Sequence, residues 1–151
     1  MGNLFAVFIW IVAIYTSFKV TKRAYQIIEN LPKDIVDSYR ISLLFENIDN
    51  KNHYPECNAV GEKDKFVFLL CRNGTQMFFT LWSNPSTILN KKYELDRKYR
   101  RENIELTGYG FMETSKRKSW HNITKTDFDN RLQRLIEITQ TENPDSEKSS
   151  H

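Results

Sequence analysis

The sequence predicts an α+β domain that follows an N-terminal transmembrane helix. Three observations support this fold class: an uncharged apolar run at the N-terminus, an Asn-Gly hairpin pattern in the middle of the chain, and a helical pattern near the C-terminus. Hairpins combined with separate helical segments are typical of α+β domains. We therefore expect a mainly antiparallel sheet with helices packed on it and one helix closing the C-terminus.

The N-terminal run contains no charged side chain from residue 2 to residue 18. As a helix it is roughly 25 Å long, and a hydrocarbon core of ~30 Å can thin to accommodate it. A cleaved signal peptide is disfavoured because no basic side chain precedes the run, and a buried core helix because the run is apolar on every face. MGNLFA resembles a myristoylation signal, but Ala6 stands where Ser or Thr is preferred. We predict a signal-anchor helix.

Basic residues follow this run directly. Lys19, Lys22 and Arg23 come after it, whereas only the α-amino group precedes it. The positive-inside rule then predicts a single-pass membrane protein with a cytoplasmic C-terminal domain. Cys57 and Cys71 are expected to be reduced in that compartment. An external domain with a Cys57–Cys71 disulfide is the open alternative, because the chain holds an even number of cysteines.

The helical pattern continues beyond the uncharged run. Apolar residues recur at helical spacing at Val20, Ala24, Ile27, Ile28 and Leu31. Pro32 then disfavours further helix. We predict that residues 1–30 form the transmembrane helix with an amphipathic stalk. The stripe either packs on the protein's own domain, which we favour, or lies on an anionic lipid surface.

The rest of the chain divides into an α+β domain at residues 31–140 and a polar tail at residues 141–151, predicted to be disordered. Residues 39–47 read as a strand, although a helix over residues 35–45 is the alternative.

The strongest local pattern is a β-hairpin. KFVFLLCR and TQMFFTLW flank Asn73-Gly74, a pair that suits a type I′ turn. Such a turn pairs Arg72 with Thr75. Both faces of the hairpin are mostly apolar, which indicates a central position in the sheet. Phe78 and Trp82 lie on the face of the hairpin opposite the one expected to pack on the last helix. They are either covered core residues, which we favour, or candidate binding residues.

Further elements follow from local signals. Asn84-Pro85 predicts the start of a helix that continues to Arg101. Residues 105–113 read as one strand, with residues 116–123 as its return partner. Thr126 is expected to cap the last helix, with Asp129 completing the capping box. The core face of that helix is predicted to hold Phe128, Leu132, Leu135 and Ile136.

A basic segment is the other candidate binding region. Its six basic residues are Lys91, Lys92, Arg97, Lys98, Arg100 and Arg101. Glu94–Lys98 and Asp96–Arg100 are at i,i+4 spacing, which favours an ordinary solvated helix face. Binding of anionic lipid is the first alternative, and nucleic acid is the less favoured one, because a net charge of +3 is mild.

Residues 53–121 contain no recognisable catalytic or metal-binding pattern. His53, Cys57, Cys71 and His121 do not have zinc-site spacing, and Gly108-Tyr109-Gly110 lacks the third glycine of a nucleotide-binding motif. We expect no catalytic residues, no cofactor and no metal.

Together these patterns predict a membrane-anchored, non-catalytic accessory or interaction protein, such as an assembly factor, a complex subunit or an inhibitor of immunity type. Its expected partners are the lipid bilayer and a second protein. The competing hypothesis is a membrane-tethered enzyme with a cryptic site. A pocket with converging polar groups would favour the enzyme, and a flat apolar sheet face would favour the interaction protein.

Overall fold

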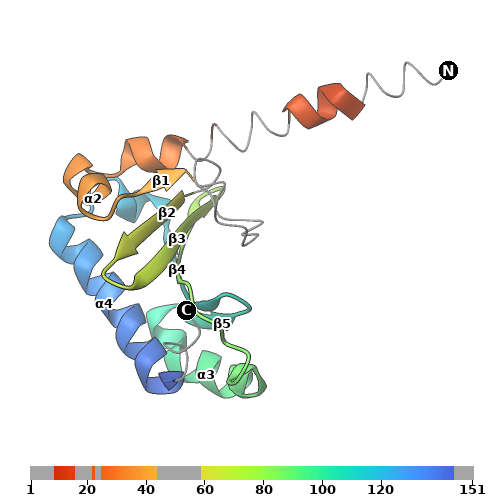
Figure 1. Ribbon diagram of the computed structural model, residues 1–151, viewed down its shortest axis with the longest axis vertical. Helices are drawn as coiled ribbons and strands as arrows, with labels where there is room; N and C mark the ends of the chain where they lie inside the picture. The colour runs from red at the N-terminus through yellow and green to blue at the C-terminus, as the bar shows by residue number, and fades with distance from the viewer. Residues whose placement is uncertain (1–8, 16–21, 23–24, 44–58, 145–151) are drawn as a thin grey trace.

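The computed structural model describes residues 9–15, 22, 25–43 and 59–144, and it shows an α+β domain built on one antiparallel sheet (Figure 1). The six strands lie in the order β1-β2-β3-β4-β6-β5. They are β1 (Ser42–Leu43), β2 (Ala59–Lys63), β3 (Phe66–Asn73), β4 (Gln76–Leu81), β5 (Ile104–Thr107) and β6 (Gly110–Lys116). The predicted fold class is confirmed for the domain.

Helices and 3-10 turns accompany the sheet. The helices include α2 (Lys33–Ser38), α3 (Lys92–Tyr99) and α4 (Lys125–Glu142). The 3-10 turns are η1 (Leu89–Lys91), η2 (Arg100–Glu102) and η3 (Arg117–Trp120). Residues 9–15 and 25–30 are also helical. The helix predicted from Pro85 therefore begins only at Lys92, after a turn in which Leu89 N donates to Pro85 O.

One face of the sheet, here called the core face, carries the main hydrophobic core. Phe68 of β3 and Phe79 of β4 lie on it and pack against Phe128 of α4, with ring centroids 5.6 and 5.2 Å from Phe128. Tyr39 and Trp120 add further rings around Phe128. The predicted inward side chains of α4, Phe128, Leu132, Leu135 and Ile136, are all buried, as expected.

Every described helix with buried side chains packs on this core face. Ile27, Ile35, Leu95 and Leu132 belong to the same hydrophobic cluster as Phe68 and Phe79. The opposite face of the sheet, here called the second face, is formed by alternate residues of the same strands. It carries Val60, Val67, Leu69, Cys71, Phe78, Thr80, Trp82, Met112 and Thr114. Among the described residues, no helix packs on it.

The β3–β4 hairpin has the predicted faces but a different register. Arg72 pairs with Met77 and Leu70 with Phe79, so Gly74 and Thr75 form the two-residue turn instead of Asn73 and Gly74. Gly74 has φ +57°, and Thr75 does not have a positive φ, an arrangement expected of a type II′ turn. The predicted pairing of Arg72 with Thr75 is therefore wrong by two residues.

A second hairpin replaces the strand that was predicted over residues 105–113. β5 ends at Thr107, which pairs with Gly110 at the start of β6, so Gly108 and Tyr109 form the turn. At Gly110, with φ +128°, an added Cβ would lie 2.3 Å from Leu81 O. The predicted return strand over residues 116–123 is also wrong, because β4 supplies the partner of β6 and η3 follows it.

The last helix begins two residues earlier than predicted. Thr124 is the N-cap, and its Oγ1 accepts a hydrogen bond from Asp127 N at 3.1 Å. The helix continues to Glu142, and Asn143 after it is buried. The chain is thus ordered beyond Thr141, where the disordered tail was predicted to start; residues 145–151 lie outside the described part.

The predicted stalk packs on the domain. Ile27 and Leu31 are buried in the main cluster, and Ile28 is partly buried against it. Val20 and Ala24 lie outside the described residues. After Pro32 the chain forms α2 and then β1. Residues 35–38 of the predicted alternative helix are therefore helical, and the strand predicted from residue 39 begins only at Ser42.

Residues 9–15 differ from every other helical segment of the described chain in their exposure. Their large apolar side chains Ile9, Trp10, Ile11, Val12, Ile14 and Tyr15 are 43–70 % exposed. Within the part of the chain that the structure describes, no helix has both the length and the apolar character needed to cross a bilayer. The remaining residues of the predicted span, 2–8 and 16–18, lie outside that part.

Candidate functional site

The second face of the sheet presents two of the predicted binding residues. Phe78 and Trp82 are half-buried there, whereas Leu69 between them is fully buried. Trp82 packs with Val67 against Leu69, and its ring stacks on Tyr109 with centroids 5.8 Å apart. Part of each aromatic side chain thus stays accessible on a face to which the described helices contribute nothing.

The predicted basic segment covers the edge of the sheet beside β5. Asp96 Oδ1 accepts a hydrogen bond from Leu106 N at 2.7 Å. Lys92 Nζ donates to Asp96 Oδ2 at 2.7 Å and also to Leu106 O. An uncovered edge strand is a template for pairing with another chain, so these contacts protect β5. Lys92 therefore has a structural role.

A second group of contacts joins the α3 end of the domain to α4. Glu142 accepts hydrogen bonds from Lys98 Nζ at 2.5 Å and from the Tyr99 hydroxyl at 2.6 Å. Arg134 Nε and Nη2 donate to the two carboxylate oxygens of Glu102 at 2.7 and 2.9 Å. The Lys98 bond, with that of Tyr99, lowers the pKa of Glu142, and the Arg134 bonds lower the pKa of Glu102. Lys98, like Lys92, is thus used within the fold.

The i,i+4 ion pairs predicted for this segment are not those that form. Glu94 and Arg100 appear in no ion pair among the described residues, while Asp96 pairs with Lys92 and Lys98 with Glu142. The pairing of Lys98 with Glu142 could not be predicted from local spacing, because the two residues are 44 positions apart in the chain.

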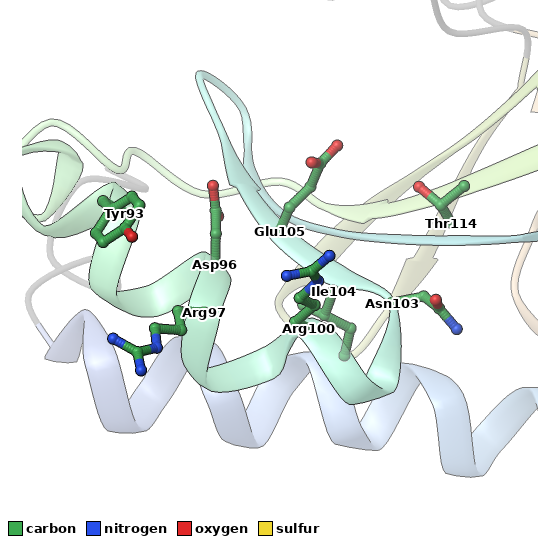
Figure 2. Close-up of a pocket in the computed structure, with 8 residues that line it drawn as sticks. All are labelled: Tyr93, Asp96, Arg97, Arg100, Asn103, Ile104, Glu105 and Thr114. Atoms are coloured by element: carbon green, nitrogen blue, oxygen red, sulfur yellow. The ribbon is translucent and has the colours of Figure 1, made fainter.

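Arg97 and Arg100 line an open pocket of about 500 Å³ between the α3 segment and the end of the sheet. Figure 2 shows the side chains that line it, with Tyr93 and Asp96 on α3 and Glu105 on β5. The other residues of the lining are Asn103, Ile104 and Thr114. Lys91 and Arg101, the remaining basic residues of the segment, are exposed but do not line this pocket.

The backbone of β5 contributes to this pocket as well. Thr114 N donates to Asn103 O at 2.9 Å, and in an antiparallel pair the bonded residues alternate. The N–H and C=O of Ile104 therefore point away from β6, to the same side as those of Leu106. The pocket is thus lined by two guanidinium groups, two carboxylates and the outward-facing backbone groups of Ile104.

A second open pocket of about 530 Å³ lies near the start of α4. Asp129 Oδ1 accepts hydrogen bonds there from the Tyr39 hydroxyl and, at 3.1 Å, from Lys63 Nζ. Lys125 Nζ donates to Ser38 Oγ at 2.9 Å in the same pocket. These contacts join the end of α2, the end of β2 and the start of α4, so the polar side chains that form them have a structural role.

The most deeply placed charged pair lies on the core face. Arg131 Nη1 of α4 donates to Glu113 Oε1 of β6 at 2.9 Å, and its guanidinium packs over the Trp120 ring at 5.1 Å. Burial raises the pKa of Glu113, and the charge of Arg131 opposes this shift. Displaced pKa values can mark catalytic sites, but here one carboxylate oxygen of Glu113 is paired with Arg131 of the neighbouring helix.

Four residues of the α3 pocket lie outside the predicted segment 91–101 and were missed by sequence reasoning: Asn103, Ile104, Glu105 and Thr114. Asn103 has φ +55°, which asparagine tolerates better than most residues, and this ends η2 and turns the chain into β5. Glu105 and Thr114 reach the pocket only because β5 and β6 form a hairpin. The sequence signal for this hairpin is Gly108-Tyr109: recognised as a turn, it would have predicted that β5 and β6 pair.

Potential metal ligands do not gather in the described part of the chain: no group of three His, Cys, Asp or Glu side chains converges there. Cys71 is buried in β3, and Cys57 lies outside the described residues, so the predicted redox state of the two cysteines stays a prediction.

Comparisons with protein-family models, with curated proteins and with solved structures give no match.

Proposed function

We propose that the protein is a single-pass membrane-anchored, non-catalytic interaction protein whose cytoplasmic domain binds a protein partner through the second face of the sheet. The observation that carries the anchor is the exposure of the helix at residues 9–15. Its side chains are apolar all round, with Trp10 70 % exposed. An exposed apolar helix of this kind is stable where lipid surrounds it.

The basic residues after the uncharged run support the proposed orientation. Lys22 is exposed, three positions before the helical residues 25–30 that pack on the domain. Lys19 and Arg23 are its sequence neighbours, and such residues favour the cytoplasmic side.

The second face supports protein binding because its half-exposed aromatic side chains lie at the centre of a sheet. Phe78 lies in β4, a strand with hydrogen-bonded neighbours on both sides, and Trp82 follows the end of β4, where its N–H donates to Val67 O at 2.8 Å. Rigid aromatic residues of this kind commonly contribute most of the binding energy at protein interfaces.

The enzyme hypothesis has less support from the two open pockets. Each has one carboxylate that already joins secondary-structure elements: Asp96 accepts from Leu106 N of β5, and Asp129 of α4 accepts from Lys63 of β2. Variants with one altered residue in each pocket test whether the pockets contribute to partner binding. We expect Arg97→Lys and Asp129→Asn to bind the partner as the wild type does.

The lipid and nucleic-acid hypotheses for segment 91–101 are also less favoured. Two of its six basic side chains, Lys92 and Lys98, bind carboxylates within the fold. Moreover, α3 lies at the opposite end of the domain from residues 25–30, where the chain enters from the proposed anchor (Figure 1).

Alkaline carbonate extraction of cell membranes tests the anchor. We expect the full-length chain to stay in the membrane pellet, and the Ile11→Arg variant to be released, because a central arginine costs roughly 2.5–3.5 kcal/mol on insertion. Tyr25→Arg is the matched control: it places the same charge at an exposed aromatic position on the helix that packs on the domain. Recovery of the wild type in the soluble fraction would overturn the anchor.

Thiol labelling of intact cells tests the orientation. A cysteine at exposed Asn122 should react with a membrane-impermeant reagent only after permeabilisation, with the wild-type chain as background. Reaction in intact cells would show that the domain is external.

Affinity purification in mild detergent tests the binding face. We expect the partner recovered with the wild type to be lost with Trp82→Ala and retained with Leu89→Ala, which removes an exposed apolar side chain of η1. Denaturation of both purified variants confirms that they are folded. Equal recovery with Trp82→Ala and wild type would refute the second face as the interface.

A further inference from the structure

A second basic cluster lies at the end of the domain that faces the proposed anchor. Lys116, Arg117 and Lys118 follow one another at the end of β6 and the start of η3. Arg117 lines a narrow hollow together with Gln26 and Asn30 of the helical residues 25–30. The cluster and this helix are therefore neighbours, although they are about ninety positions apart in the sequence.

Three contacts fix the geometry of this end. The Arg72 guanidinium donates to Gln26 Oε1 at 2.5 Å, which joins β3 to the helix. Arg117 N donates to Thr75 O at 2.8 Å, which joins η3 to the β3–β4 turn. Lys116 pairs with Gln76 across β4 and β6. The hairpin turn, the basic cluster and the entering helix form one continuous surface.

The described part of the fold does not neutralise the positive charge of this cluster. Lys116 and Lys118 are exposed and Arg117 is half-buried, and none of the three forms an ion pair among the described residues. Lys22, which is also exposed, precedes Gln26 by four positions in the chain. Within the helical residues 25–30, Glu29 is the one carboxylate. The surface therefore carries a net positive charge.

The chain length keeps this surface close to the bilayer. Ten backbone steps separate Tyr15, at the end of the exposed apolar helix, from Tyr25, where the packed helix begins. Ten residues span at most roughly 33–36 Å when extended, and about 15 Å as a helix. The α3 segment is held at the other end of the molecule (Figure 1).

We infer that Lys116, Arg117 and Lys118 form a membrane-contact surface that binds anionic lipid headgroups and orients the domain on its bilayer. The inference rests on the proposed anchor. Clusters of basic residues beside a transmembrane helix are attracted to anionic leaflets, and this attraction weakens as salt is added. It assigns lipid contact to the η3 end instead of to segment 91–101.

Energy transfer in reconstituted vesicles tests the inference. The full-length chain, in a Cys57→Ser background, is labelled at Ser119→Cys, an exposed position within η3, and the acceptor is a headgroup-labelled lipid. We expect several-fold higher transfer in phosphatidylcholine vesicles that contain phosphatidylserine than in pure phosphatidylcholine. The increase should disappear at high salt.

Two charge variants provide the matched comparison. Lys116→Gln/Arg117→Gln/Lys118→Gln should reduce transfer to the value for pure phosphatidylcholine, whereas Lys91→Gln/Arg97→Gln/Arg101→Gln removes the same charge from the α3 end and should leave transfer unchanged. Equal transfer in the two lipid mixtures, or equal behaviour of the two variants, would overturn the inference. Flotation of the same vesicles reports the anchor separately: protein that floats without increased transfer refutes only the lipid contact, and protein that does not float refutes the anchor and the contact together.

Discussion

The carboxylate of Asp96 on α3 accepts a hydrogen bond from the backbone N–H of Leu106 on β5 at 2.7 Å. Lys92, four residues earlier in the chain, donates to the carbonyl oxygen of the same Leu106. Two side chains thus replace the missing neighbour strand at this position. The sheet ends at β5 because a short helix satisfies its edge.

Removal of this cover should destabilise the β5 edge. We expect Asp96→Ala to lower the free energy of unfolding by about 1.5–3 kcal/mol, as for a hydrogen bond to a charged group, and to increase exchange of the Leu106 amide hydrogen. Denaturant unfolding and hydrogen exchange measure the two effects. Glu94→Ala is the control, since Glu94 is an exposed carboxylate on the same helix. Unchanged protection of Leu106 in the Asp96 variant would contradict this role.

The β5–β6 turn provides a matched pair of glycines. Gly110 has φ +128°, and an added Cβ would lie 2.3 Å from Leu81 O, whereas an added Cβ at Gly108 meets nothing within 4 Å. We expect Gly110→Ala to cost at least about 2 kcal/mol of unfolding free energy, and Gly108→Ala to stay within about 0.5 kcal/mol of wild type. Equal stability of the two variants would show that the turn can relax around the extra methyl group.

The two faces of the sheet should respond differently to loss of an aromatic ring. Phe128 is fully buried among four other rings, so Phe128→Ala should cost about 3–5 kcal/mol. Trp82 is half-buried on the second face, and Trp82→Ala should cost only about 1–2 kcal/mol. Urea unfolding of both variants measures this difference. A cost for Trp82→Ala as large as that for Phe128→Ala would make Trp82 a core residue.

Glu142 should make stability depend on acid pH. Hydrogen bonds from Lys98 and Tyr99 lower its pKa below the ordinary value of 4.5, so the native state binds a proton less readily than the unfolded state. The associated stability is complete above 4.5 and is lost as the pH falls through the lowered native value. Glu142→Gln lacks this component, so its stability difference from the wild type should shrink between pH 6 and pH 3, approximately as the carboxyl titrates.

Chemical denaturation at several pH values checks this prediction. Glu94→Gln serves as the control, because Glu94 forms no ion pair in the described part of the chain. A difference between wild type and Glu142→Gln that does not change with pH would mean that the carboxylate contributes by shape alone.

Alternation along the strands could be predicted, but their register could not. The apolar pattern placed Phe68 and Phe79 on one face and Phe78 and Trp82 on the other, as the structure has them. A slip of two residues preserves this alternation, so the pattern does not distinguish the predicted turn from the observed one at Gly74 and Thr75. The choice is made by the turn geometry and by the neighbouring strands.

Competition between similar local signals explains the helix start. Thr124–Asp127 and Thr126–Asp129 both have the spacing of a capping box. In the structure Thr124 caps α4, and Asp129 instead accepts hydrogen bonds from Tyr39 and Lys63. These partners are distant in sequence, so tertiary contacts decide between two equivalent local patterns.

The candidate pocket beside α3 was predictable only in part. Arg97 and Arg100 are evident from the basic segment, but the pocket also needs Glu105 and Thr114 from a hairpin whose turn was read as strand interior. The pairing of β5 with β6 brings these residues together, and the spacing of residues within segment 91–101 does not predict that pairing.

The end of α4 has a practical consequence for anyone who attaches a label or a fusion partner. Asn143 Nδ2 donates to Asn84 O at 2.8 Å, and its Oδ1 accepts from Thr87 Oγ1 at 3.0 Å, so the residue that follows the helix is tied to the loop before η1. A fusion joined after residue 144 therefore leaves from the α3 end of the domain, and neither the second face nor the η3 surface has to bear it. Truncation before Asn143, in contrast, removes the hydrogen bonds that join the end of α4 to Asn84 and Thr87.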